Sequence, residues 1–161
     1  MKTLFKITLL LFLLYSPVTA AELRNDAALD GLTEAKVVFD INQGDLSRLL
    51  LRLKFVDKTY NQLAAFGATP KMVLAFRGKA SRYVTQGEDY VPSTDLPNKH
   101  KVEKWIAEFK QRGMVLEQCA LAANLLKIDV EEFLPQIKVV ANGYISLIGY
   151  QNKGYAFIPM D

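Results

Sequence analysis

The residue best suited to chemistry is Cys119, the single cysteine in this sequence of 161 residues. It directly follows the expected strand 114–118 (MVLEQ) and precedes 120–127, a run of good helix formers. A thiol between a strand and a helix meets unpaired N–H groups and the positive end of the helix dipole, and both favour the thiolate. The pattern predicts a reactive thiol, and it leaves open the alternative of a buried, inert cysteine that only fills space.

Further candidate residues follow from the rule that open parallel sheets bind ligands outside the carboxyl ends of their strands. The expected pocket residues around Cys119 are Arg77, Gly78, Ala120, Leu121, Asn124, Asn142 and Gly143. Arg77 would supply a positive charge, and the N–H groups of Ala120 and Leu121 would stabilise an anion. Glu117 would oppose a thiolate if its side chain faces the same way as the thiol.

Several kinds of site are not expected. His100 is the only histidine and lies in a charged stretch, so we expect a solvated surface residue and no metal site. Gly78 lacks the glycine-rich spacing of a dinucleotide loop, and the sequence holds no G-x-S-x-G elbow. We therefore expect no cofactor.

The elements that would position these residues alternate along the chain. Short β-branched or apolar runs predict strands at 36–41, 72–76, 114–118, 137–140 and 155–158. Helical patterns lie between them, at 46–66, 99–112, 120–127 and 144–152, with shorter helical turns at 80–84 and 129–132. This order predicts a single-domain α/β fold over 34–161, with a five-stranded, mostly parallel sheet and helices on both faces. Residues 85–98 form a long polar loop, either a lid or interface loop or a tolerated insertion.

The N-terminus has the three-part pattern of a secretory signal peptide. Lys2 and Lys6 precede the apolar run 7–15, and Pro17 and small residues lead to an expected cleavage after Ala20. The run is about half the roughly 20 residues that span a bilayer, so a membrane anchor is not expected. We expect residues 21–33 to be a polar leader, and the protein to be periplasmic or secreted.

Cleavage would also change the charge balance. Without Lys2 and Lys6 the net charge of +3 falls to +1, which gives no reason to expect nucleic-acid binding.

Successive sequence segments of the chain resemble those of the DsrE/DsrF-like family of small sulfur-relay α/β proteins, here in an exported branch. The resemblance covers residues 36–159, and its most specific part is GMVLEQCALAANLLKI followed by the tail FLPQIKVVANGYISLIGYQNKGYAFIP. It implies the five-stranded α/β fold, a homo-oligomer, and a cysteine that carries sulfur as a persulfide. That role would fall on Cys119.

Three functions remain open from the sequence. The first is a sulfur carrier or sulfurtransferase, in which Cys119 accepts sulfur from a donor and passes it to a protein or small thiol acceptor. The second is a non-catalytic oligomeric binding or assembly module of the periplasm. The third is a thiol redox sensor that forms an intermolecular disulfide through Cys119.

Overall fold

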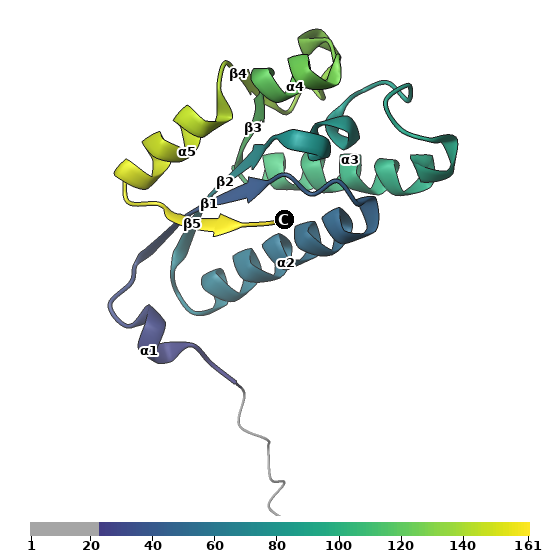
Figure 1. The fold of residues 1–161 in the computed structure, drawn as a ribbon. Helices are drawn as coiled ribbons and strands as arrows, with labels where there is room; N and C mark the ends of the chain where they lie inside the picture. Colours follow the sequence, from purple (N-terminus) through teal and green to yellow (C-terminus); the bar gives the residue numbers. More distant parts are fainter. Residues whose placement is uncertain (1–22) are drawn as a thin grey trace, which may run out of the picture.

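The computed structural model describes residues 23–161, which form a five-stranded sheet in the order β4-β3-β2-β1-β5. Every pair of neighbouring strands is parallel, which confirms the predicted α/β fold (Figure 1). The strands are β1 (Glu34–Ile41), β2 (Thr69–Phe76), β3 (Val115–Cys119), β4 (Lys138–Val140) and β5 (Ala156–Pro159).

Helices cover both faces of this sheet, but unequally. Strands β1 to β4 follow one another in one direction, and β5 returns to pair with β1. Right-handed crossovers therefore put α2 (Leu46–Ala65) and α3 (Leu96–Gln111) on one face and α5 (Gly143–Asn152) alone on the other (Figure 1). The shorter helices are α1 (Asp26–Leu29), α4 (Ala120–Leu126), and the 3₁₀ helices η1 (Gly78–Val84), η2 (Ser93–Asp95) and η3 (Val130–Glu132).

The larger core lies between the sheet and the α2–α3 layer. Helix α2 begins at a capping residue, Asp45, whose carboxylate accepts the N–H of Arg48 at 2.8 Å. Its apolar stripe, which includes Leu49 and Leu53, is fully buried against the sheet. On the other face a smaller cluster joins Leu147 of α5 to Val38, Val73 and Ala75.

Some predicted boundaries are wrong by up to three residues. The helix expected from Lys99 begins at Leu96, because Pro97 fits the first turn of a helix, where its missing N–H costs nothing. Strand β2, expected from residue 72, begins at Thr69 and includes Pro70. Strand β3 extends to Cys119, so the thiol residue itself ends the strand.

Two N-terminal predictions have different outcomes. The predicted signal peptide, residues 1–20, lies outside the described residues. The expected leader is described from Leu23 onward, and it contains the exposed single-turn helix α1. Within residues 23–161, no helix combines the length and the apolar character needed to cross a membrane.

Candidate functional site at Cys119

Cys119 lies where two helix N-termini meet at the carboxyl edge of the sheet. It is the last residue of β3 and the N-cap residue of α4, and it is 3% exposed. Its Sγ accepts a hydrogen bond of 3.2 Å from the backbone N–H of Gly143, the first residue of α5. A backbone N–H at a helix N-terminus favours negative charge on the sulfur. The sulfur therefore has a backbone hydrogen-bond donor at a buried position.

The approach of α5 to the thiol depends on the absence of a side chain at position 143. A Cβ atom on Gly143 would stand 3.0 Å from the Cβ of Cys119 and 3.4 Å from its Sγ. Asn142 fixes the start of the helix, since its side-chain oxygen accepts the N–H of Tyr144 at 3.0 Å. The N–H donor is thus held against the sulfur by a capped helix and a residue without a side chain.

Arg77 brings a positive charge to the same edge. It follows β2, and its guanidinium donates to both carboxylate oxygens of Asp40, each at 2.5 Å. The guanidinium also lies 4.9 Å from the ring centre of Tyr144 and donates to its hydroxyl at 3.3 Å. The Asp40 hydrogen bond raises the pKa of Arg77 most, burial lowers it, and the charges of Asp40, Tyr144 and Cys119 add smaller increases. Asp40 therefore fixes the position of the Arg77 guanidinium and takes up much of its charge.

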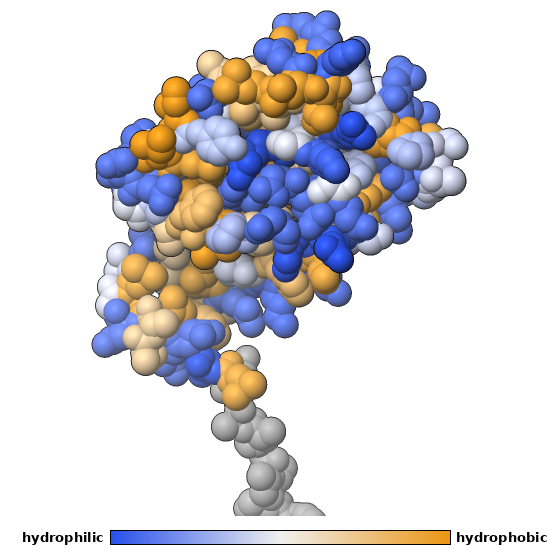
Figure 2. Space-filling model, in the orientation of Figure 1, coloured by the Kyte–Doolittle hydropathy of each residue, from blue (hydrophilic) through white to orange (hydrophobic). Residues whose placement is uncertain are grey.

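A pocket of about 290 Å³ opens beside the thiol, and we call it the Cys119 pocket. One wall is cationic, from Arg77 and Lys79, and the other is aliphatic, from α4. The lining residues are Arg77, Gly78, Lys79, Cys119, Leu121, Ala122, Leu125, Leu126 and Tyr144. Apolar side chains continue onto the surface over α4 and α5, where Figure 2 shows them gathered. A small anion bound next to an apolar group would match this lining.

The model of the DsrE/DsrF-like family matches residues 36–160, which include the thiol, the pocket and the sheet apart from the first two residues of β1. The chain belongs to the DsrE/DsrF-like family. A curated relative, an uncharacterised protein of Aquifex aeolicus (strain VF5), is 30% identical over 125 residues, which are 77% of this chain. The chain spans 55% of the length of that relative.

Solved structures with the DsrE-like fold resemble this one over most of its length. MTH1491 of Methanobacterium thermoautotrophicum, a protein of unknown function, superposes with a TM-score of 0.62 at 20% identity. The match covers 78% of this chain and 99% of that one. The ychN protein of E. coli superposes with a TM-score of 0.53 at 11% identity, and the match covers 78% of this chain and 98% of that one. At such identities the likeness establishes the fold alone.

The structure brings together part of the predicted DsrE-like site. Arg77, Gly78 and Leu121 line the pocket with Cys119, and Gly143 contacts the sulfur directly. Ala120, Asn124 and Asn142 are not among the lining residues, and Asn124 is exposed. The expected N–H donors of Ala120 and Leu121 make no hydrogen bond to Sγ, because the first N–H of α5 occupies that role.

Sequence reasoning missed Asp40, Lys79 and Tyr144. The sequence does contain a signal for Asp40, because a carboxylate near the end of a buried strand needs a partner. Tyr144 begins the expected helix 144–152, and its position beside Arg77 follows only from the packing of α5 against β1 and β2. Lys79 stands next to Gly78, whose φ of +54° turns the chain after β2 toward the pocket.

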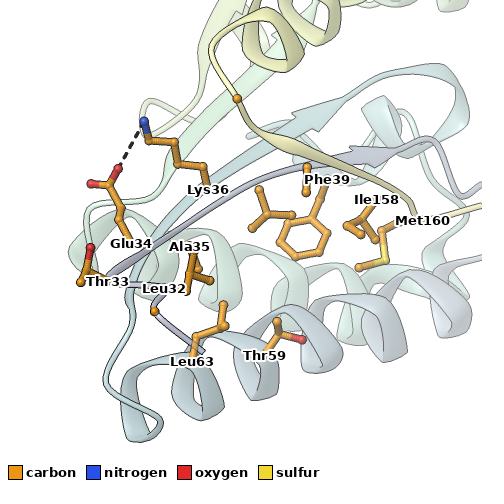
Figure 3. Close-up of a pocket in the computed structure, with 14 residues that line it drawn as sticks. Leu32, Thr33, Glu34, Ala35, Lys36, Phe39, Thr59, Leu63, Ile158 and Met160 are labelled. Atoms are coloured by element: carbon orange, nitrogen blue, oxygen red, sulfur yellow. Dashed lines mark ion pairs between the residues drawn. The ribbon is translucent and has the colours of Figure 1, made fainter. Parts of the chain in front are cut away.

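A larger cavity of about 730 Å³ lies away from this chemistry. Figure 3 shows it between α2 and the strands β1 and β5, with Leu63, Phe39, Ile158 and Met160 pointing into it and the Glu34–Lys36 ion pair at its rim. About half of its lining residues are apolar, and it contains neither a cysteine nor a histidine. Within residues 23–161, no three His, Cys, Asp or Glu side chains are grouped to hold a metal ion. The Cys119 pocket remains the site with reactive groups.

Proposed function

We propose that this protein is an exported sulfur carrier or sulfurtransferase that holds sulfur as a persulfide on Cys119. The observation that carries this proposal is the contact between Cys119 Sγ and the N–H of Gly143, beside a pocket with Arg77 at its wall. Membership of the DsrE/DsrF-like family supports the same reading. Export to the periplasm or beyond rests on the sequence pattern of residues 1–20.

The proposed cycle has two displacements at sulfur. The Cys119 thiolate attacks the outer sulfur of a donor persulfide, a new S–S bond forms at Sγ, and the donor thiolate leaves with the electrons of the broken S–S bond. An acceptor thiolate then attacks the outer sulfur of the Cys119 persulfide and releases the Cys119 thiolate. No external oxidant or reductant is consumed, because each step exchanges one S–S bond for another.

The pocket matches the charges that this cycle creates. The Gly143 N–H stabilises negative charge on Sγ before attack and after release. Arg77 and Lys79 face the space where the outer sulfur of an anionic persulfide would lie. Because Asp40 already pairs with Arg77, the residual positive charge would attract the donor without trapping the bound anion.

Self-association is part of the proposal. Five large apolar side chains on α4 and α5 are more than two-fifths exposed, namely Leu121, Leu125, Tyr144, Ile145 and Ile148. A surface with so many neighbouring apolar groups is typical of an interface. It also supports the second candidate function, in which the protein is an assembly module and Cys119 only packs against α5.

Intact mass spectrometry of the mature protein, before and after brief incubation with polysulfide, separates these functions. A sulfur carrier gains whole sulfur atoms on the wild type, loses them again with dithiothreitol, and gains none as Cys119→Ser. A thiol that iodoacetamide alkylates but that gains no sulfur contradicts the carrier and favours the assembly module. A dimer on a non-reducing gel that Cys119→Ser abolishes would instead identify a redox sensor.

A further inference from the structure

The side chain of Glu117 is a second chemically distinctive group, on the face of the sheet that α5 covers. It stands on β3 two residues before Cys119, so both side chains point to the same face. Its Oε1 accepts a hydrogen bond of 2.8 Å from the hydroxyl of Tyr150, near the end of α5. Glu117 is only 7% exposed, so a carboxylate is held beneath the helix.

The other carboxylate oxygen of Glu117 is unsatisfied. Oε2 is shielded from solvent and has no hydrogen-bond partner within residues 23–161. A buried carboxylate oxygen without a partner is costly, and native structures normally satisfy it with a protein group, a water or a ligand. The pKa of the Tyr150 hydroxyl is raised by the same surroundings. Burial has the largest effect, followed by the hydrogen bond to Glu117 and then by the charge of Glu117.

Glu117 lines a pocket of about 230 Å³, separate from the Cys119 pocket, which we call the Glu117 pocket. Its other lining residues are Ile145, Ser146, Gly149, Tyr150 and Lys153. The Lys153 ammonium lies 5.8 Å from the ring centre of Tyr150 and makes no ion pair with Glu117. Lys138 stands beside Glu117 in the β3–β4 register and is exposed, also without such a pair. Among residues 23–161, no lysine pairs with the Glu117 carboxyl group, although Lys153 lines the same pocket.

We propose that the Glu117 pocket binds a guanidinium or alkylammonium group, supplied by a free small molecule or by a basic side chain of a second copy. Such a group donates hydrogen bonds to a carboxylate and packs against an aromatic ring, and Glu117 and Tyr150 both line this pocket. A metal ion would need several oxygen ligands, whereas Glu117 is the only carboxylate in the lining. The proposal is independent of sulfur transfer at Cys119.

Methylguanidinium is the probe, added to ¹⁵N-labelled full-length protein at constant ionic strength. We expect saturable shifts of the Ser146, Gly149 and Tyr150 amide signals, and at least a tenfold loss of affinity in Glu117→Gln. This variant keeps an oxygen for the Tyr150 hydroxyl, so it retains the fold, which its spectrum verifies. Glu131→Gln is the matched control, because it removes the same charge from an exposed position.

Sedimentation across a range of protein concentrations distinguishes the two sources. If a second copy supplies the cation, the wild type associates, and both methylguanidinium and Glu117→Gln weaken that association several-fold. If a free molecule supplies it, the probe binds, but neither the probe nor Glu117→Gln changes the association state of the protein.

Two results would overturn the proposal. In one, methylguanidinium does not bind, and Glu117→Gln sediments with the same mass as the wild type. In the other, the wild type ignores the probe but Lys153→Met binds it, which would mean that Lys153 of the same chain occupies the pocket in solution.

Discussion

The electrostatics at Cys119 come from backbone and glycine as much as from charged side chains. The sulfur is hydrogen-bonded by one N–H, and that N–H reaches it only because position 143 carries no Cβ. Arg77 is already paired with Asp40, so its effect on the thiol is partly neutralised. The reactivity of Cys119 should therefore respond more to the geometry of α5 than to removal of one cation.

Gly143→Ala tests that dependence on α5. The added methyl group would lie 3.0 Å from the Cβ of Cys119 and would push the helix start away from the sulfur. Weakening a hydrogen bond to a charged group by about 1 kcal/mol slows alkylation at neutral pH about fivefold. We also expect a loss of about 1 to 2 kcal/mol in unfolding free energy from overpacking.

Gly149→Ala is the matched control for this prediction. It lies on the same helix, and a Cβ there would meet no atom within 4 Å. Alanine should leave the alkylation rate unchanged and stabilise the helix by about 0.5 to 1 kcal/mol. Equal alkylation rates for Gly143→Ala and the wild type would show that the Gly143 contact does not activate the thiol.

At the scale of elements, the loop before α3 is held by an internal lysine. Lys99 is fully buried, and its ammonium donates to the carbonyl oxygen of Thr85 at 2.6 Å and pairs with Glu103 at 2.5 Å. The same loop joins η3, where Thr85 bridges Phe133 and the Gln86 amide group donates to the Phe133 carbonyl at 3.0 Å. Residues 85–98 line no part of the Cys119 pocket, so these contacts are anchors of an ordered connection.

Lys99→Met should loosen this connection. It removes the donor to Thr85 and leaves Glu103 without its partner, at an expected cost of about 1 to 3 kcal/mol. Urea unfolding measures the loss, and limited proteolysis should cut the variant faster within 85–98. Lys101→Met, on the exposed side of the same helix, should stay within about 0.5 kcal/mol of the wild type. If Lys99→Met has the unfolding free energy and the proteolysis rate of the wild type, packing alone holds the loop.

The elements were more predictable from the sequence than the contacts between them. Apolar periodicity and the Asp45 cap indicate α2 directly, because these signals are local. The strand ends were predicted as the ligand edge, and the structure places Cys119, Arg77 and Gly143 close together there. Tyr144 and the partner of Arg77 were missed, since both depend on how α5 and β1 pack beside β2. The start of α3 was predicted three residues too late, at Lys99 instead of Leu96. The polar residues before Lys99 indicated a loop, although Pro97 is compatible with the first turn of a helix.

At the scale of the molecule, the unequal covering of the sheet leaves apolar surface on one side. Two long helices fill the α2–α3 face, whereas the opposite face has α5 alone, with Ile145 and Ile148 exposed (Figures 1 and 2). The aliphatic side chains of α4 continue this surface to the rim of the Cys119 pocket. Both the thiol and Glu117 therefore lie beside the region where we expect another copy to dock.

Leu125→Glu tests whether this surface mediates self-association. Leu125 is 84% exposed, so a charged side chain there costs the folded chain little but would be desolvated in an interface. We expect the wild type to sediment as an oligomer and the variant to dissociate into single chains, with a dissociation constant at least tenfold higher. The melting temperature of the variant at low protein concentration should equal that of the wild type. Leu51→Glu, an exposed leucine of α2 on the opposite layer, should leave the assembly intact. A wild type that sediments as one chain at all concentrations would contradict the proposed homo-oligomer. It would leave the apolar rim of the Cys119 pocket as a contact surface for the sulfur acceptor.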